Sequence, residues 1–81
     1  MSHKVDKMTG TVLRRLRDRA GLTQERVAAS LGVSYQQLQK YETGKNRISV
    51  SRLFDLADVL NTEASAIIKL VEYELEGENL L

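Results

Sequence analysis

The sequence predicts an all-α domain, a compact bundle of five helices. Apolar residues recur at steps of three and four in five successive segments, which is the periodicity of amphipathic helices. The 81 residues contain no proline, and glycine or short polar turns separate the segments. A chain of this length forms one domain with a small core. We therefore expect five helices that follow one another through tight turns.

The first helix is expected over residues 11–20, after a flexible tail at residues 1–9. On this helix Arg17 lies about 40° from the centre of the apolar stripe, at the edge of the buried face. A charged side chain in that position needs a partner. The stripe itself consists of Leu13, Leu16 and Ala20.

Two short helices are expected next, over residues 24–31 and 35–43. Thr23 and Ser34 are suitable N-caps, and Gln37, three residues after Ser34, completes a capping box. Gly32 can adopt the left-handed conformation that ends a helix. So short a connection forces the two helices to cross steeply, which is the helix-turn-helix arrangement. It leaves one face of the later helix free to enter a DNA major groove.

Glu42 lies four residues after Leu38 on the third expected helix, at the same edge position that Arg17 occupies on the first. We predict an ion pair between Arg17 and Glu42 across the helix junction. The alternative is two solvated surface charges, worth under about 1 kcal/mol, but their matched placement at the core edge favours a structural bridge. The spacing of Tyr41 from Leu38 likewise indicates a core position rather than an aromatic that stacks on bases.

A fourth helix is expected over residues 50–60, capped by Ser49, and a fifth over residues 63–76, with residues 77–81 frayed. The fifth carries apolar residues on two faces, and a domain of this size cannot cover both. We expect the uncovered face to support self-association, with folding back onto the chain's own core as the competing arrangement. The residues predicted for dimerisation are Ile67, Ile68, Leu70, Val71 and Tyr73.

The net charge of +1 conceals a polarised chain. Residues 1–52 carry eleven Lys and Arg against four Asp and Glu, a net +7, whereas residues 53–81 carry one against seven, a net −6. A basic part beside an acidic part indicates that one surface meets a polyanion while the other faces water or a protein. The alternative is charge patterning for solubility alone.

The third expected helix presents a polar and nearly uncharged face opposite Leu38. Glutamine pairs bidentately with adenine, lysine donates to guanine, and hydroxyl or methyl groups contact thymine. A glutamine cluster alone would indicate an ordinary solvated face, but the caps, the turn and the charge asymmetry favour base reading. The candidate base-reading residues are Ser34, Tyr35, Gln36, Gln39 and Lys40, with Thr43 on the same side. Phosphates would be held by backbone N–H groups at the start of the second helix and by Gln24, Lys45, Asn46 and Arg47.

The segment GLTQERVAASLGVS at residues 21–34 is followed at fixed spacing by Tyr41, Glu42 and Gly44. On these residues the chain, from about Leu13 to Leu60, resembles the Cro/CI-type helix-turn-helix domain of phage repressors and bacterial XRE regulators. The resemblance implies a lambda-repressor-like bundle of five helices, cytoplasmic, usually dimeric, that binds operator DNA.

Position by position, the same resemblance implies roles for individual residues. Gln24 would contact the DNA backbone and support the reading helix, and Arg17 with Glu42 would match the family's internal ion pair. The residues implied to face bases are Ser34, Tyr35, Gln36 and Lys40. Those implied to hold phosphates are Thr43, Lys45 and Asn46.

These observations predict a sequence-specific regulator that binds double-stranded DNA, most simply a dimeric repressor with its third helices in successive major grooves. Residues 10–61 would bind DNA and residues 62–81 would form the dimerisation element. The alternative is a protein-interaction module, such as an antitoxin or adaptor, that holds a partner through the C-terminal helix. RNA binding is less favoured, because the chain lacks the exposed aromatic platform that single-stranded recognition uses.

The residue inventory argues against an enzyme. His3 is the only histidine, in the expected tail, and there is no cysteine and no glycine-rich phosphate loop. We therefore expect no catalytic residue, no metal and no cofactor. The N-terminal residues MSHKVDKM contain no apolar stretch of signal-peptide length, and no run is long enough to cross a bilayer, so we expect a cytoplasmic protein with no membrane partner.

Overall fold

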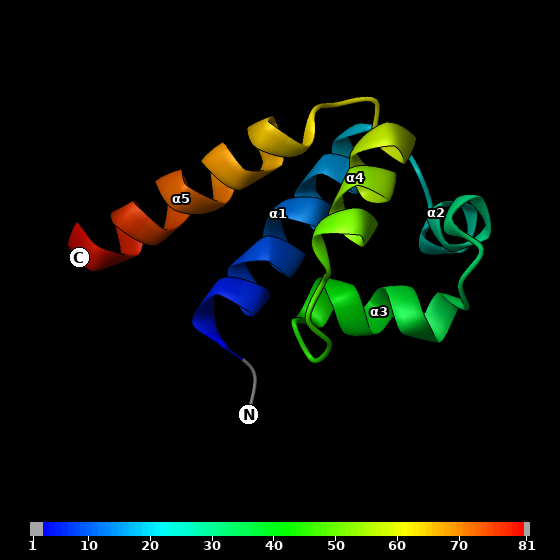
Figure 1. Cartoon of the computed structure of the whole chain (residues 1–81), viewed down its shortest axis with the longest axis horizontal. Coiled ribbons are helices and arrows are strands. Elements are labelled where there is room, and N and C mark those ends of the chain that lie inside the picture. The colour runs from blue at the N-terminus through cyan, green and yellow to red at the C-terminus, as the bar shows by residue number, and fades with distance from the viewer. Residues whose placement is uncertain (1–2, 81) are drawn as a thin grey trace.

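The computed structural model describes residues 3–80 and forms the expected bundle of five helices (Figure 1). The helices α1 and α5 lie side by side and run in opposite directions, while α3 lies along the lower edge of the molecule in this view. Within residues 3–80 no helix is both long and apolar enough to cross a membrane. The helices are α1 (Lys4–Arg19), α2 (Gln24–Leu31), α3 (Tyr35–Thr43), α4 (Val50–Val59) and α5 (Ala64–Leu80).

Helix α1 begins at Lys4, seven residues before the predicted start. The prediction of a flexible tail is therefore wrong for residues 4–9, which are helical, while residues 1–2 lie outside the described residues. His3 is the N-cap, and its Nδ1 accepts a hydrogen bond from the backbone N–H of Val5 at 3.0 Å. The core stripe also differs from the prediction, because Val12 is buried whereas Ala20 is exposed.

The predicted caps around the two-helix unit are present. The side-chain oxygens of Thr23, Ser34 and Ser49 each accept a hydrogen bond from the backbone N–H three residues on, at 3.0 to 3.1 Å. Gly32 ends α2 with φ 72°, in the left-handed region. Only half of the predicted capping box forms, because within residues 3–80 the Gln37 side chain makes no bond back to the backbone of Ser34. Helices α2 and α3 cross steeply, as expected for so short a turn (Figure 1).

The core corrects two of the residues predicted for dimerisation. Ile67 is 0% exposed and Val71 is 6% exposed, because α5 packs its first apolar face against α1 and α4 of the same chain. These two side chains are therefore core residues and cannot reach a second copy. Helix α5 also continues to Leu80 rather than fraying from Gly77, and Leu81 lies outside the described residues.

Two glycines allow α1 to lie directly against the end of α3. A Cβ atom added at Gly10 would lie 2.5 Å from the carbonyl oxygen of Tyr41, and closer still to that of Glu42. A Cβ at Gly44, where φ is +77°, would lie 2.6 Å from the Cα of Lys7. Backbone therefore meets backbone here, and the position of α3 relative to α1 is fixed without an intervening side chain.

This contact predicts that Gly10→Ala destabilises the fold. The added methyl group has only rigid backbone carbonyls to displace, so we expect a loss of about 1 to 3 kcal/mol in the free energy of unfolding, measured by urea denaturation. Gly77→Ala is the matched control, because a Cβ there would meet no atom within 4 Å. In a helix this control should raise stability by up to about 1 kcal/mol. If both variants raised the unfolding midpoint alike, α1 and α3 would not be in close contact.

Candidate nucleic-acid interface

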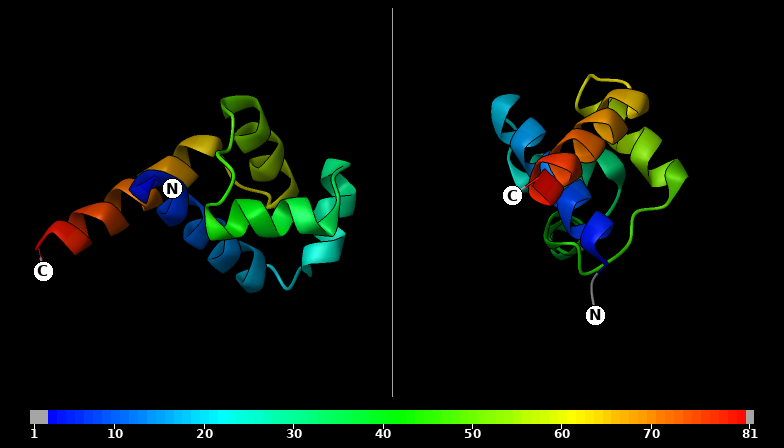
Figure 2. Two further views of the ribbon diagram at one scale, coloured as in Figure 1. Left: turned by 90° about the horizontal axis from the view of Figure 1, so that it is seen from below. Right: turned by 90° about the vertical axis from the view of Figure 1, so that its left-hand side faces the viewer.

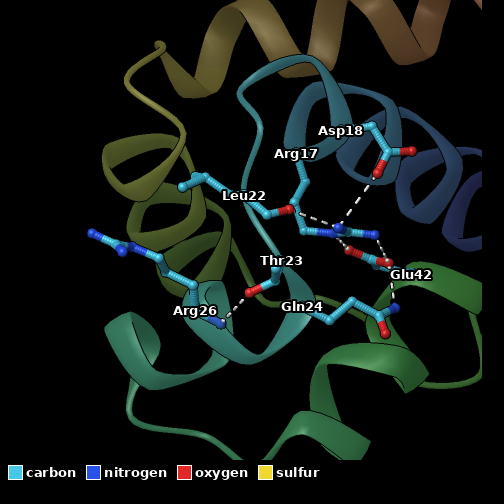
Figure 3. A network of polar contacts seen from close by, with 7 residues as sticks. All are labelled: Arg17, Asp18, Leu22, Thr23, Gln24, Arg26 and Glu42. Carbon is cyan, nitrogen blue, oxygen red and sulfur yellow. Dashed lines mark hydrogen bonds and ion pairs between the residues drawn. The ribbon is translucent and has the colours of Figure 1, made fainter.

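A buried ion pair joins α1 to α3 beneath the candidate interface (Figure 3). The Nε of Arg17 donates to Oε2 of Glu42 at 2.6 Å, and its Nη2 donates to Oε1 at 3.1 Å. The two residues are only 8% and 7% exposed. The hydrogen bonds to Glu42 raise the pKa of Arg17. The pair foreseen from the sequence is thus formed, with the bidentate geometry that suits a guanidinium and a carboxylate.

The same pair is held from two further sides. The Nη1 of Arg17 donates to the backbone carbonyl of Leu22 at 2.8 Å, which fixes the turn that leads into α2. The side-chain amide of Gln24, at the start of α2, donates to Oε1 of Glu42 at 2.8 Å. As Figure 3 shows, these contacts converge on one guanidinium and one carboxylate. The network therefore ties together α1, the start of α2 and the end of α3.

Above this network lies an open groove of about 630 Å³. It runs along α3, onto which the left view of Figure 2 looks. Six of the ten residues predicted to contact DNA line it, together with Arg14 from α1 and the carboxylate of Glu42. The six are Gln24, Gln36, Gln39, Lys40, Thr43 and Lys45.

The residues at the N-terminal tip of α3 are placed differently. Ser34 serves as the N-cap, so its hydroxyl oxygen is already bonded to the N–H of Gln37 at 3.0 Å. Tyr35 is exposed, and its hydroxyl accepts a hydrogen bond from the amide of Gln39 at 2.8 Å. This bond orients the Gln39 amide before any ligand arrives, and leaves its oxygen and its second N–H free for pairing.

The residues after α3 fall into two groups. Lys45 lines the groove, and the backbone N–H of Asn46 donates to the carbonyl of Lys40 at 3.2 Å, which closes the end of the helix. Arg47 lies outside the groove, where its Nε donates to Oδ2 of Asp6 on α1 at 3.1 Å. Arg47 therefore has an intramolecular partner that the sequence did not indicate. Tyr41 packs against the core, as its spacing predicted.

Arg14 is the groove residue that had no assigned role in the sequence-based prediction. It was placed only as one of the arginines that point away from the core stripe of α1. The signal that identifies it is spatial, because the contact between α1 and the end of α3 brings it beside residues more than twenty positions later in the chain.

Comparison with known proteins decides the family. The model of the HTH_3 helix-turn-helix family matches residues 13–67, more than half of the chain. The chain belongs to the HTH_3 family of transcriptional regulators. The predicted Cro/CI or XRE type is thereby confirmed, and the family is one of regulators rather than enzymes.

Individual relatives agree with this family. An uncharacterised transcriptional regulator in the ATPase CF(0) region of Rhodospirillum rubrum is 52% identical over 58 residues, which are 72% of this chain and 54% of that protein. The restriction-modification controller protein C.AhdI from Aeromonas hydrophila is 30% identical, with a TM-score of 0.72, over 75% of this chain and 92% of that one. This HTH_3 chain spans about half the length of the curated relatives it matches.

The fold is matched by a more distant structure. The clp gene regulator ClgR from Corynebacterium glutamicum aligns with a TM-score of 0.91 at 19% identity, covering 99% of this chain and 85% of that one. At this identity the match establishes the fold alone. It covers all five helices of this HTH_3 chain, α5 included, and confirms the predicted all-α architecture.

The ion-pair network predicts that Glu42→Ala destabilises the domain strongly. The substitution leaves the buried Arg17 guanidinium without its counter-charge, which costs about 3 to 5 kcal/mol in the free energy of unfolding. Urea denaturation followed by circular dichroism measures the loss. Glu25→Ala is the control, because Glu25 is exposed on α2 and its removal should change stability by no more than about 0.5 kcal/mol. Equal midpoints for the two variants would show that the pair contributes no more than a solvated surface contact.

Proposed function

We propose that this chain is a sequence-specific transcriptional regulator that binds double-stranded DNA as a dimeric repressor, with α3 in the major groove. One observation carries the proposal: the polar face of α3 is exposed and lines an open groove, while its opposite face is locked to the core. Leu38 and Glu42 are buried, so α3 presents its amide-rich side outward. A helix held in this way can act as a rigid probe of base edges.

The chemistry of the groove fits DNA. Gln36 and Gln39 offer amides for adenine, and Lys40 offers an ammonium group for guanine. Lys45 at the end of α3 adds a positive charge for phosphates, and the N-terminal N–H groups of α2, beside Gln24, add a partial one. We propose that Ser34 and Tyr35 face bases at the tip of α3, and that Thr43, Asn46 and Arg47 approach the DNA backbone.

A dimer would place two such helices about 34 Å apart, on one face of a nearly palindromic site. Exposed apolar side chains on α5 support self-association. Ile68 is 48% exposed, Leu70 is 40% exposed and Tyr73 is 72% exposed. These three remain from the residues predicted for the dimer, and we propose that they form its interface.

Repression is the simplest regulatory outcome, because occupancy of a promoter by a bound dimer excludes other proteins without further contacts. In this proposal residues 10–61 bind DNA and residues 62–81 dimerise, in the cytoplasm where bacterial DNA lies. Residues 4–9 join the first unit, because they are helical and Lys7 lies against Gly44. The same exposed side chains of α5 also support the second candidate, an antitoxin or adaptor that holds a different protein.

The first test is selection of bound duplexes from a random pool, followed by binding measurements at several salt concentrations. We expect one preferred half-site, and an affinity that falls with salt at a log–log slope of several, close to −0.9 for each phosphate contacted. Gln36→Ala should relax the base preference, whereas Lys45→Ala should weaken all sequences alike. Lys69→Ala, an exposed lysine on α5, is the control and should change neither property.

Two results would contradict the proposal. One is an affinity that does not depend on salt, because phosphate contacts release counterions. The other is identical behaviour of Gln36→Ala and Lys45→Ala, because the proposal gives these side chains different targets.

The second test concerns the dimer. An aspartate at an exposed apolar position of the interface should place an unpaired charge in it, so we expect Tyr73→Asp or Ile68→Asp to convert a dimer into a monomer in sedimentation experiments. Ala29→Asp adds the same charge to an exposed position of α2 and should leave the mass unchanged. A wild-type chain that is monomeric yet binds DNA through one half-site would instead favour the antitoxin or adaptor function for α5.

A further inference from the structure

Arg14 forms part of the groove wall from outside the helix-turn-helix unit. It lies on α1, whereas the other cationic groups of the groove, Lys40 and Lys45, belong to α3 and the residues after it. Its side chain is exposed, and within residues 3–80 it makes no hydrogen bond or ion pair. The guanidinium is therefore available to a ligand in the groove.

The other arginines of α1 have different surroundings. Arg17 is buried against Glu42, and Arg15 is paired with Glu74 of α5 at 2.9 Å. Arg19 is exposed beside Leu70 and Glu74, in the separate depression between α1 and α5. Among the arginines of α1, Arg14 is the one that combines exposure, absence of a partner in the described chain and a place in the groove.

The electrostatics of the groove favour an anion at Arg14. The carboxylate that lines the groove is that of Glu42, and it already accepts three hydrogen bonds, two from Arg17 and one from Gln24. Its charge is thus largely compensated inside the protein. Arg14, Lys40 and Lys45 are left as the exposed charges of the groove.

We propose that Arg14 holds a phosphate of the DNA backbone, as a contact from α1 that is separate from those of the helix-turn-helix unit. The inference rests on the proposed function, with α3 in the major groove. A helix that fills the major groove leaves the backbone strand to the elements that flank it. Arg14 flanks α3 on α1, and a guanidinium can hold a phosphate through two parallel N–H···O bonds. The contact fixes the protein on the duplex and does not select the sequence.

The test compares Arg14→Ala and Arg19→Ala with the wild-type chain, each on the selected duplex and on a scrambled duplex, over a range of salt concentrations. We expect Arg14→Ala to weaken binding to both duplexes several-fold, by a similar factor, and to reduce the salt slope by about 0.9. Arg14→Lys should retain the slope, because it keeps the charge, while binding less tightly than wild type, because it loses the paired hydrogen bonds. Arg19→Ala removes the same charge from the other side of α1 and should bind like wild type.

The outcomes separate this inference from the proposed function. If the wild-type chain selects a site and shows a steep salt dependence, but Arg14→Ala matches it in affinity and slope, the phosphate contact is wrong and the proposed function stands. If Arg14→Ala relaxes the preference at one base pair without changing the slope, Arg14 reads a base and the inference is also overturned. Failure of the wild-type chain to bind any duplex would overturn the proposed function and this inference together. Thermal unfolding of each variant checks that the fold is intact.

Discussion

The buried pair of Arg17 and Glu42 is the interaction on which the candidate interface depends. It joins helices that are 25 residues apart in the sequence and lies directly beneath the groove. Because both charges are almost fully buried, each is stable only while the other is in place. The pair also holds the carbonyl of Leu22 and the amide of Gln24, so the turn before α2 and the end of α3 are fixed by the same few atoms. The helix-turn-helix unit is thus fastened to α1 by polar contacts where its apolar contacts end.

The outer face of α3 follows from this arrangement. Its buried side supplies Leu38 to the core and Glu42 to the ion pair, which leaves the intervening positions exposed. Those positions carry amides and a lysine, whose contribution to the core is small. The hydrogen bond between Tyr35 and Gln39 then orders part of that face within the helix itself. Scaffold and surface are therefore carried by different side chains of one short helix.

Much of this was accessible from the sequence, because it depends on local signals. N-caps, the left-handed glycine and apolar periodicity identify α2 and α3 nearly to the residue, and the matched edge positions identify the Arg17–Glu42 pair. The start of α1 was missed because its first turns are polar and Gly10 reads as a helix breaker. Its role is a close contact with backbone some thirty residues later. The two apolar faces of α5 were visible, but only packing shows that Ile67 and Val71 belong to the core. Arg14 and the Asp6–Arg47 pair likewise depend on tertiary proximity, which no local pattern encodes.

The contact of Gly10 and Gly44 with neighbouring backbone has a consequence for how binding preference can diverge among related chains. With no side chain between α1 and the end of α3, there is no residue whose change in size could tilt the probe by a few degrees. New preferences are then open only through exchange of the outward side chains, each of which can vary without repacking the interior. Such a scaffold behaves as a fixed handle with replaceable teeth, and swapping the outer residues of α3 between family members is the natural route to a regulator with altered targets.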